Sequence, residues 1–213
     1  MSCKVSPSSV PASHFEEVFK NNPDPWHCDW KRDPIGALKC LFYEQRRYWN
    51  ILRTIPRKRY RHGLELGCAT GIFTQSLAKR CERLLAIDYS ETAIAFGRRR
   101  CRKLSQVRFE HARIPDEFPE GNFDLIILSE VAYYLSMADF LTTVHHIVES
   151  LTPGGHFLMV HCRNHREVPL PGDLPHDTFI KETADVLTHL QDRRRPRTYR
   201  LDLFEKPIDR SSG

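Results

Sequence analysis

Glu65-Leu66-Gly67-Cys68-Ala69-Thr70-Gly71 is the most informative stretch of this sequence. It follows a short run at 61–66 that predicts a strand, and it leads into 71–81, which has the pattern of a helix. The glycines allow a tight turn, and the small residues keep the loop low, so a ligand can lie close to the main chain. This strand–turn–helix context predicts the first unit of an α/β sheet.

Strand and helix patterns alternate beyond this turn. Leu125-Ile126-Ile127-Leu128 is apolar on both faces, which is typical of a central parallel strand covered by helices. Pro153-Gly154-Gly155 is expected to stop the helix that precedes it. The sequence therefore predicts an α/β, Rossmann-like, doubly wound and mostly parallel sheet. We expect strands at 84–88, 106–110, 123–129 and 156–162, and helices at 90–103, with Ser90 as N-cap, and at 137–151.

The ends of the chain are less regular, and we divide the sequence into four parts. Residues 1–13 are rich in Ser and Pro and are expected to be mobile. Residues 14–56 are expected to form an N-terminal helical lid, 57–207 the Rossmann-like domain and 208–213 a tail. Within these parts we expect helices at 14–20, capped by Ser13, and at 35–55, a loop at 166–177, a helix at 178–191 and a last strand at 198–204 near a sheet edge.

Composition narrows the class of protein. The 213 residues are enough for one domain, and the net charge is +5. We find no apolar stretch long enough to span a membrane and no secretory signal, so we expect a cytoplasmic protein. The seven cysteines form no C-x-x-C pair, which argues against a disulfide framework. Basic clusters at 57–61, 98–103 and 193–195 could contact phosphates, but solvated helix faces and loops explain them more simply.

An acid ends the second predicted strand. Asp88 lies 23 residues after Glu65, where a carboxylate can accept hydrogen bonds from both hydroxyls of a ribose and disfavours a 2′-phosphate. The loop reads G-x-A-x-G rather than the dinucleotide fingerprint G-x-G-x-x-G, and no Lys-Ser/Thr pair follows it as in a P-loop. Glu65 would repel a pyrophosphate but can face a cation. Together these features predict S-adenosylmethionine, which carries a sulfonium and an amino group.

Several motifs resemble one family. Residues 65–71 look like motif I of the class I, Rossmann-like methyltransferases, and Asp88 looks like their ribose-binding acid. More specifically, residues 14–163 resemble the nodulation protein S (NodS) family, through Asp24-Pro25-Trp26, Tyr43-Glu44-Gln45-Arg46-Arg47-Tyr48, Ser129-Glu130-Val131-Ala132-Tyr133-Tyr134-Leu135 and Pro153-Gly154-Gly155. The resemblance implies a class I methyltransferase fold and N-methylation of an amino sugar, as in a de-N-acetylated chitooligosaccharide. It also implies S-adenosylmethionine as cofactor and S-adenosylhomocysteine as product.

We expect the cofactor to contact the turn, the strand ends and the lid. Arg47 is expected to pair with the carboxylate of the methionine part, and Trp26 to cover the adenine or the acceptor. Many relatives hold the adenine amine with an Asp after the third strand; here Glu110, His111 and backbone groups remain as alternatives. The predicted cofactor-binding residues are Trp26, Tyr43, Arg47, Glu65, Gly67, Cys68, Gly71, Asp88, Tyr89, Ala112, Arg113, Ser129 and Glu130.

The predicted catalytic residues follow the fourth and fifth strands. Methyl transfer to an amine requires alignment of the reactants and removal of a proton, and open α/β sheets place the site at the carboxyl ends of their strands. Glu130 is expected to bind a cationic acceptor or take its proton, with a salt-bridging role as the alternative. His161 is expected to accept the proton. Tyr133 is expected, with Tyr134, to pack the acceptor or to contact the sulfonium.

Other functions fit the sequence less well. The spacing of His161, Cys162 and His165 does not match a common zinc site, so we expect no metal. An N- or O-methyltransferase of another small natural product is the main alternative. A nucleic-acid methyltransferase is less favoured, because base amino-methyltransferases carry (Asp/Asn)-Pro-Pro-aromatic where this chain has Ser129-Glu130-Val131-Ala132. We therefore expect a small-molecule acceptor, no nucleic-acid or membrane partner, and a monomer or weak dimer.

Overall fold

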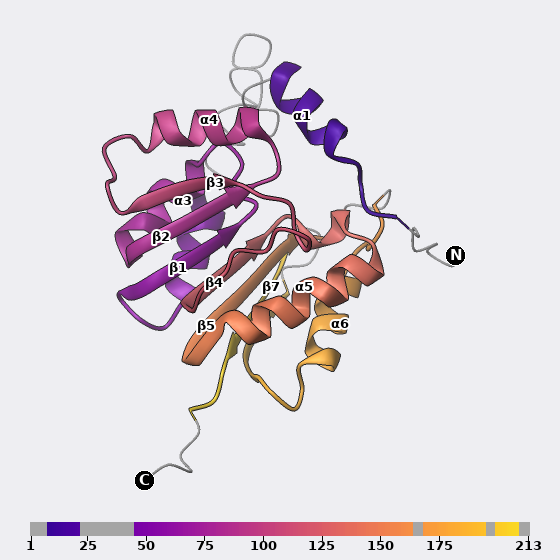
Figure 1. The fold of residues 1–213 in the computed structure, drawn as a ribbon. Helices are drawn as coiled ribbons and strands as arrows, with labels where there is room; N and C mark the ends of the chain where they lie inside the picture. The colour runs from indigo at the N-terminus through magenta and orange to yellow at the C-terminus, as the bar shows by residue number, and fades with distance from the viewer. Residues whose placement is uncertain (1–7, 22–44, 164–167, 195–198, 209–213) are drawn as a thin grey trace.

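The computed structural model describes residues 8–21, 45–163, 168–194 and 199–208. Within these residues a seven-stranded sheet has the order β3-β2-β1-β4-β5-β7-β6 (Figure 1). The first five strands are parallel, and β7 runs antiparallel to both β5 and β6. The strands are β1 (Tyr60–Leu66), β2 (Cys81–Asp88), β3 (Val107–His111), β4 (Phe123–Ser129), β5 (Leu151–Cys162), β6 (Thr188–Arg194) and β7 (Tyr199–Glu205).

Helices cover both faces of the sheet, as expected for a doubly wound fold. One face packs against α5 (Met137–Ser150) and α6 (Leu174–Glu182), and the other against α3 (Ile72–Leu77) and a helix over 45–54. The strand β4 contributes to both, since Ile126 and Leu128 lie in the first core and Leu125 and Ile127 in the second. The other helices are α1 (Ala12–Asn21) and α4 (Glu91–Arg100), with the short 3-10 turns η1 (Ala78–Arg80) and η2 (Ala132–Tyr134). The predicted fold class is confirmed.

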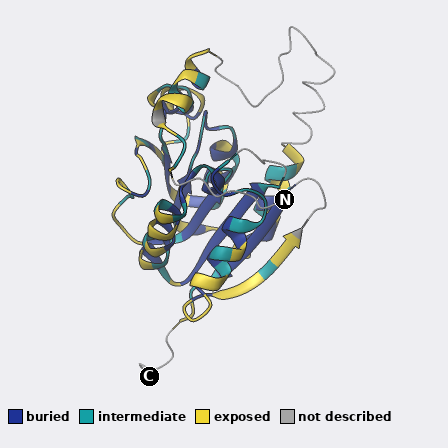
Figure 2. Cartoon of the chain, turned by 90° about the vertical axis from the view of Figure 1, so that its right-hand side faces the viewer, coloured by how far each residue is buried: buried dark blue, intermediate teal, exposed yellow. Residues whose placement is uncertain are grey.

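The C-terminal part differs from the sequence prediction. The expected helix at 178–191 is wrong, because α6 ends at Glu182 and residues 188–194 form β6. The expected last strand at 198–204, near a sheet edge, is confirmed as β7, which lies between β5 and the edge strand β6. Figure 2 shows why β6 is hard to recognise: its described side chains are mostly exposed, so the strand has no buried apolar alternation to mark it.

Two smaller differences concern strand and helix starts. The Pro-Gly-Gly stretch at 153–155 lies inside β5, which begins at Leu151 and is irregular in its pairing with β4 there. The helix α1 begins at Ala12, so Ser13 lies within its first turn and is not the N-cap. In contrast, the Ser90 hydroxyl accepts the N–H of Ala93 and caps α4 as predicted.

The N-terminal segment lies over the carboxyl ends of the strands. The Val10 N–H donates to the Tyr134 carbonyl at 2.8 Å, and the Ser136 N–H donates to the Ser9 hydroxyl at 2.5 Å. Ser9 and Val10 thus contact the segment that follows β4. The expected mobility of residues 1–13 stays a prediction. The chain division at residues 13, 56 and 207 also stays a prediction, since residues 22–44 lie outside the described part.

Candidate functional site

The turn after β1 is shaped by residues with left-handed backbone. Gly67, Ala69 and Gly71 have φ angles of 80°, 46° and 74°. The N–H groups of Gly67 and Cys68 both donate to the Ile87 carbonyl, at 3.0 and 2.9 Å. A Cβ on Gly67 would lie 2.1 Å from Cγ2 of Val131, so this position has no room for a side chain. The glycine therefore lets the turn approach the segment that follows β4.

Asp88 lies beside this turn at the end of β2. Its carboxylate accepts the Ala69 N–H at 2.8 Å and the Ser90 N–H at 3.0 Å. Burial raises the pKa of Asp88, while these backbone hydrogen bonds oppose the increase. Each oxygen carries one of these bonds and has further acceptor capacity, so the carboxylate can still receive hydroxyl groups.

Glu65 forms a second, deeper acidic group. It is 3% exposed, and burial raises its pKa to about 8, with a lowering contribution from the Thr74 hydroxyl and a raising one from Asp88. Its Oε2 makes no well-formed hydrogen bond within the described residues. A buried carboxyl with acceptor capacity left over fits a cationic or N–H-bearing ligand.

These groups line a cavity of about 370 Å³ at the carboxyl ends of β1, β2 and β4. The volume is in the range of ordinary small-ligand sites. Among the predicted site residues, the lining includes Arg47, Glu65, Gly67, Cys68, Asp88, Tyr89, Ala112, Arg113, Ser129, Glu130 and Tyr133. Gly71 shapes the turn without lining the cavity, and Trp26 and Tyr43 lie outside the described residues.

The far wall of the cavity is centred on Glu130. This residue has a φ of 60°, and its carboxylate pairs with the Arg47 guanidinium. Oε2 of Glu130 also accepts the Tyr133 hydroxyl at 2.7 Å and the Cys162 N–H at 3.1 Å. Burial, with Glu130 beside it, raises the pKa of Tyr133, which stays a phenol and a donor. The salt-bridging alternative for Glu130 is therefore realised, and Arg47 and Glu130 meet in the same wall.

The helix α1 closes one side of the cavity, and the sequence did not single out its residues. The Phe15 ring packs edge-on against Tyr134, with centroids 4.8 Å apart, and also against Tyr89 at 6.3 Å. Glu16 accepts the hydroxyls of Ser90 and Thr92, both at 2.5 Å. Helical spacing of Phe15 and Phe19, both in the lining, is the signal that could have indicated an apolar face turned to a ligand.

His161 does not fit its expected role as proton acceptor. It is fully buried and does not line the cavity. Its Nε2 already accepts the N–H groups of Val131 and Ala132, at 3.2 and 3.0 Å. Because its only basic nitrogen in this arrangement is occupied by backbone, His161 cannot receive a proton from a ligand in the cavity.

The structure also leaves fewer groups that could hold the adenine amine. Glu110 pairs with Arg108 at 2.6 Å, and Nε2 of His111 lies 2.9 Å from the Tyr89 carbonyl. Neither residue lines the cavity, whereas Ala112, Arg113 and Ile114 do. Backbone groups of residues 112–114 are therefore the remaining candidates.

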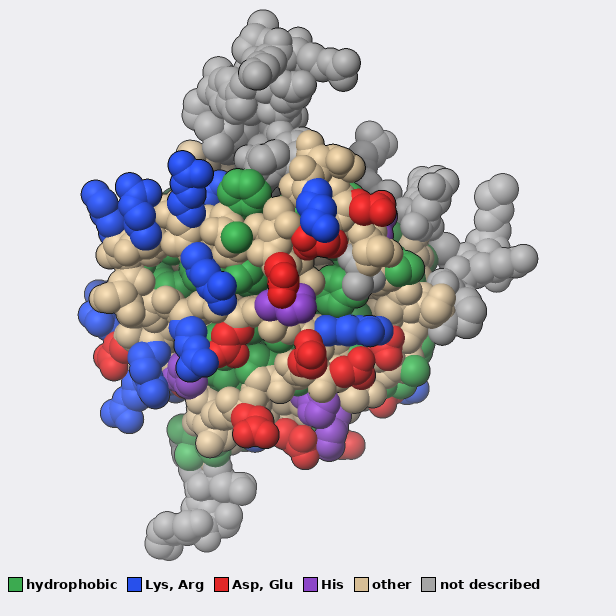
Figure 3. Space-filling view, turned by 45° about the horizontal axis from the view of Figure 1, so that its top comes forward, with side chains coloured by type: hydrophobic (Ala, Val, Ile, Leu, Met, Phe, Trp, Pro, Cys, Tyr) green, Lys and Arg blue, Asp and Glu red, His purple; other side chains and the backbone are tan. Residues whose placement is uncertain are grey.

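Two other classes of site are absent from the described residues. These residues contain no group of three or more His, Cys, Asp or Glu placed to hold a metal ion, and His165 lies outside them. None of their helices is both long and apolar enough to cross a membrane. Figure 3 shows Lys and Arg side chains gathered on one side of the viewed face and Asp and Glu mostly on the other. The exposed Arg98–Arg100 turn of α4 does not line the cavity.

The chain is similar to known proteins in sequence and in fold. The family model described as nodulation protein S matches residues 24–171. Nodulation protein S of Sinorhizobium fredii (strain NBRC 101917 / NGR234) is 36% identical over 137 residues, which cover 63% of this chain and 59% of that protein. That of Rhizobium tropici is 32% identical over 142 residues, covering 66% of this chain and 56% of that protein. The chain thus spans less than two thirds of the length of these curated relatives.

Solved structures extend the similarity. A putative methyltransferase from Pseudomonas syringae is 33% identical with a TM-score of 0.68, covering 78% of this chain and 99% of that one. The N-methyltransferase NodS from Bradyrhizobium japonicum WM9, in complex with S-adenosyl-l-homocysteine, has a TM-score of 0.73 at 26% identity, covering 93% of this chain and 100% of that one. The family match spans more than half of the sequence and includes the turn, Asp88 and Glu130. The chain therefore belongs to the nodulation protein S family.

Proposed function

We propose that this chain is an S-adenosylmethionine-dependent methyltransferase that methylates an amine of a small molecule, with a de-N-acetylated chitooligosaccharide as the acceptor. The observation that carries the proposal is the acidic pair of Glu65 and Asp88 beside the glycine turn. Asp88 can accept hydrogen bonds from the two ribose hydroxyls, and Glu65 can accept hydrogen bonds from the amino group of the methionine part. The relative from Bradyrhizobium japonicum with S-adenosyl-l-homocysteine supports the same choice of cofactor.

S-adenosylmethionine, when bound, supplies an electrophilic methyl group on a sulfonium. The residues of the chain hold and surround the reactants. Arg47, which also pairs with Glu130, would hold the cofactor carboxylate, while residues 112–114 would hold the adenine and Tyr89 the ribose. The aromatic groups Phe15 and Tyr134 exclude water above the cavity, in the manner of a lid.

Glu130 faces the acceptor in this proposal. A carboxylate beside an amine favours its cationic form, so Glu130 aids binding of an ammonium ion and by itself opposes deprotonation. With His161 committed to backbone, the proton passes to solvent or to another group of the cavity wall. A lysine-like amine has a pKa of about 10.4 in water, and the electron-withdrawing oxygens of a sugar lower this pKa, so an amino sugar passes from its cationic to its neutral form as pH rises through the neutral range. The initial rate is therefore expected to rise with pH through the neutral range.

The test is a transfer assay with matched acceptors. The protein is incubated with isotope-labelled S-adenosylmethionine and with chitooligosaccharides that carry one free amine, and the products are located by tandem mass spectrometry. Fully N-acetylated oligosaccharides of the same length are the control, since they lack only the free amine. We expect label on the nitrogen of the de-N-acetylated sugar and none on the control. Label on a hydroxyl, or equal label on both, would contradict the proposal.

A further inference from the structure

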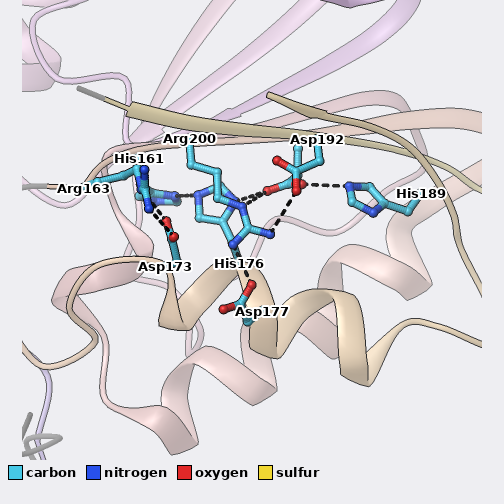
Figure 4. Close-up of polar contacts among 9 residues, drawn as sticks. His161, Arg163, Asp173, His176, Asp177, His189, Asp192 and Arg200 are labelled. Carbon is cyan, nitrogen blue, oxygen red and sulfur yellow. Dashed lines mark hydrogen bonds and ion pairs between the residues drawn. The ribbon is translucent and has the colours of Figure 1, made fainter. Parts of the chain in front are cut away.

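A buried row of side chains connects the C-terminal strands with the turn that bears Glu130. Figure 4 shows His161 and His176 of this row with their charged neighbours. It consists of His161 on β5, His176 on α6 and Asp202 on β7, all fully buried. Nδ1 of His161 lies 3.2 Å from Nε2 of His176, and Nδ1 of His176 lies 2.6 Å from Oδ2 of Asp202. At the other end, Nε2 of His161 meets the N–H groups of Val131 and Ala132.

The two ends of this row fix the position of every proton in it. A backbone N–H can only donate, so Nε2 of His161 is unprotonated and its Nδ1 carries the hydrogen. That hydrogen is donated to Nε2 of His176, which must then carry its own hydrogen on Nδ1 and donate it to the Asp202 carboxylate. Both imidazoles are therefore neutral Nδ1–H tautomers. Consistent with this, burial lowers the pKa of His176 despite the neighbouring Asp202.

Asp202 is kept ionised by its other partners. Its Oδ2 accepts Nε of Arg200 at 2.7 Å, and its Oδ1 lies 2.7 Å from Nε2 of His189. Burial opposes ionisation, but the hydrogen bond from His176 and the charge of Arg200 outweigh it and lower the pKa of Asp202. An ionised carboxylate can only accept hydrogen bonds, so Asp202 must receive the hydrogen from Nδ1 of His176.

Ion pairs hold the helix that carries His176. Asp173, the residue before α6, accepts Nε and a terminal nitrogen of Arg163 at 2.7 and 2.6 Å. On the next turn, Asp177 accepts a terminal nitrogen of Arg200 at 2.6 Å. These bonds bind α6 to β5 and β7 on both sides of His176, so its imidazole has a fixed place between His161 and Asp202.

The row of side chains holds the turn at 130–134 through hydrogen bonds to His161. Glu130 has a left-handed φ of 60°, which is unfavourable for a residue with a side chain. Just beyond it, the N–H groups of Val131 and Ala132 precede or begin η2 and would lack helix partners, but His161 accepts both. The Tyr133 ring also packs against the His161 ring, with centroids 5.3 Å apart.

We propose that His161, His176 and Asp202 are positioning residues, whose ordered hydrogen bonds hold the 130–134 turn so that Glu130 and Tyr134 face the acceptor. This inference rests on the proposed function, because it assigns the turn to the acceptor side of the same cavity. None of the three residues touches a reactant, since none lines the cavity.

Imidazole nitrogen NMR tests the proton arrangement directly, without any assay of activity. In the two-bond ¹H–¹⁵N spectrum of the uniformly labelled protein, we expect His161 and His176 to appear as neutral Nδ1–H tautomers at neutral pH. An Nε2–H tautomer or an imidazolium at either residue would overturn the assignment. Asp202→Asn, whose amide can donate toward His176, is expected to disturb both imidazole signals; an unchanged His161 signal would contradict the connection.

A pair of substitutions tests the positioning role. His161→Phe keeps an aromatic ring but removes the acceptor for Val131 and Ala132, whereas His161→Gln offers an amide oxygen in its place. We expect His161→Phe to lower kcat/KM for the amine acceptor by roughly a hundredfold, the effect of misplacing a group by about 1 Å, and His161→Gln to recover most of it. S-adenosylhomocysteine affinity should fall much less than kcat/KM in both variants, because the Gly67 turn and Asp88 are unchanged and the 130–134 turn reaches the cofactor only through the Arg47–Glu130 pair.

The possible outcomes separate the two proposals. Full activity in His161→Phe, or a parallel loss of S-adenosylhomocysteine binding in both variants, would overturn the positioning role. If His161→Phe does not fold, the tautomer spectrum of the wild type and of Asp202→Asn decides. A wild type that shows the expected tautomers but transfers no methyl group to amines would instead contradict the proposed function and leave the hydrogen-bond arrangement standing.

Discussion

The two walls of the cavity are built by different means. The wall formed by Glu65–Gly71 and Asp88 comes from two adjacent strand ends, and its shape depends on left-handed backbone and on N–H groups. The opposite wall, around Glu130, is held by side chains from β5, α6 and β7, which are distant in sequence. A short motif can therefore specify the first wall, whereas only the completed fold specifies the second.

The largest effect is expected where the two walls meet. Gly67→Ala places a methyl group against Val131 in addition to requiring a left-handed alanine, and should destabilise the protein by about 2–5 kcal/mol. Gly172→Ala is a matched control, because Gly172 has a φ of +65° but no atom within 4 Å of its added Cβ. Urea denaturation measures both. Equal losses would mean that backbone conformation alone, and not the approach of the walls, accounts for the effect.

A smaller effect is expected within the Glu130 wall. Glu130→Gln removes the charge that faces the acceptor and Arg47, and should raise the acceptor KM by about tenfold, as for a lost hydrogen bond to a charged group. Tyr133→Phe is the control, since it removes one hydrogen bond to Glu130 and keeps the charge. Initial rates over a range of acceptor concentrations give both constants. A fall in kcat with unchanged KM would place the role of Glu130 in the transition state instead.

The affinity of the Glu65–Asp88 wall for S-adenosylmethionine should depend on pH. With its pKa raised to about 8, Glu65 is largely protonated at neutral pH, and a cationic cofactor favours its ionised form. Binding of S-adenosylmethionine should therefore release a proton and tighten as pH rises from about 6 toward 8. Calorimetry in two buffers of different ionisation enthalpy measures the release. Glu65→Gln should abolish it; proton release that persists in this variant would assign it to another group.

The smallest effect concerns the contact of α1 with α4. Hydrogen bonds from Ser90 and Thr92 lower the pKa of Glu16 from 4.5, so their contribution is complete above that value and is lost as pH falls through the lowered one. Glu16→Gln should increase hydrogen exchange of the α1 amides by a few fold at neutral pH, since the carboxylate is partly exposed. The exposed neighbour Glu17→Gln is the control. No difference between the variants would indicate that α1 is held by Phe15 and Val10 alone.

The sequence prediction succeeded where neighbours along the chain determine the structure. Ser90 could be placed because it caps its own helix, and Gly67 and Asp88 because they lie at the ends of two strands, β1 and β2, that follow one another along the chain and pair side by side. His161 was assigned the wrong task because its partners, His176 and Asp202, approach it only when α6 and β7 pack against β5. The strand β6 was missed for a similar reason: its pairing with β7 stabilises a polar segment that has no strand pattern of its own.

Calorimetric titration of S-adenosylhomocysteine into Asp88→Ala and His161→Phe tests the division between the two walls most directly. Asp88→Ala should weaken binding by roughly 2–3 kcal/mol, because two hydrogen bonds to the ribose are lost. His161→Phe should weaken binding much less, since it leaves Asp88 and the Gly67 turn unchanged and acts on the cofactor only through the Arg47–Glu130 pair. Wild-type affinity in Asp88→Ala, or a comparable loss in His161→Phe, would contradict the account.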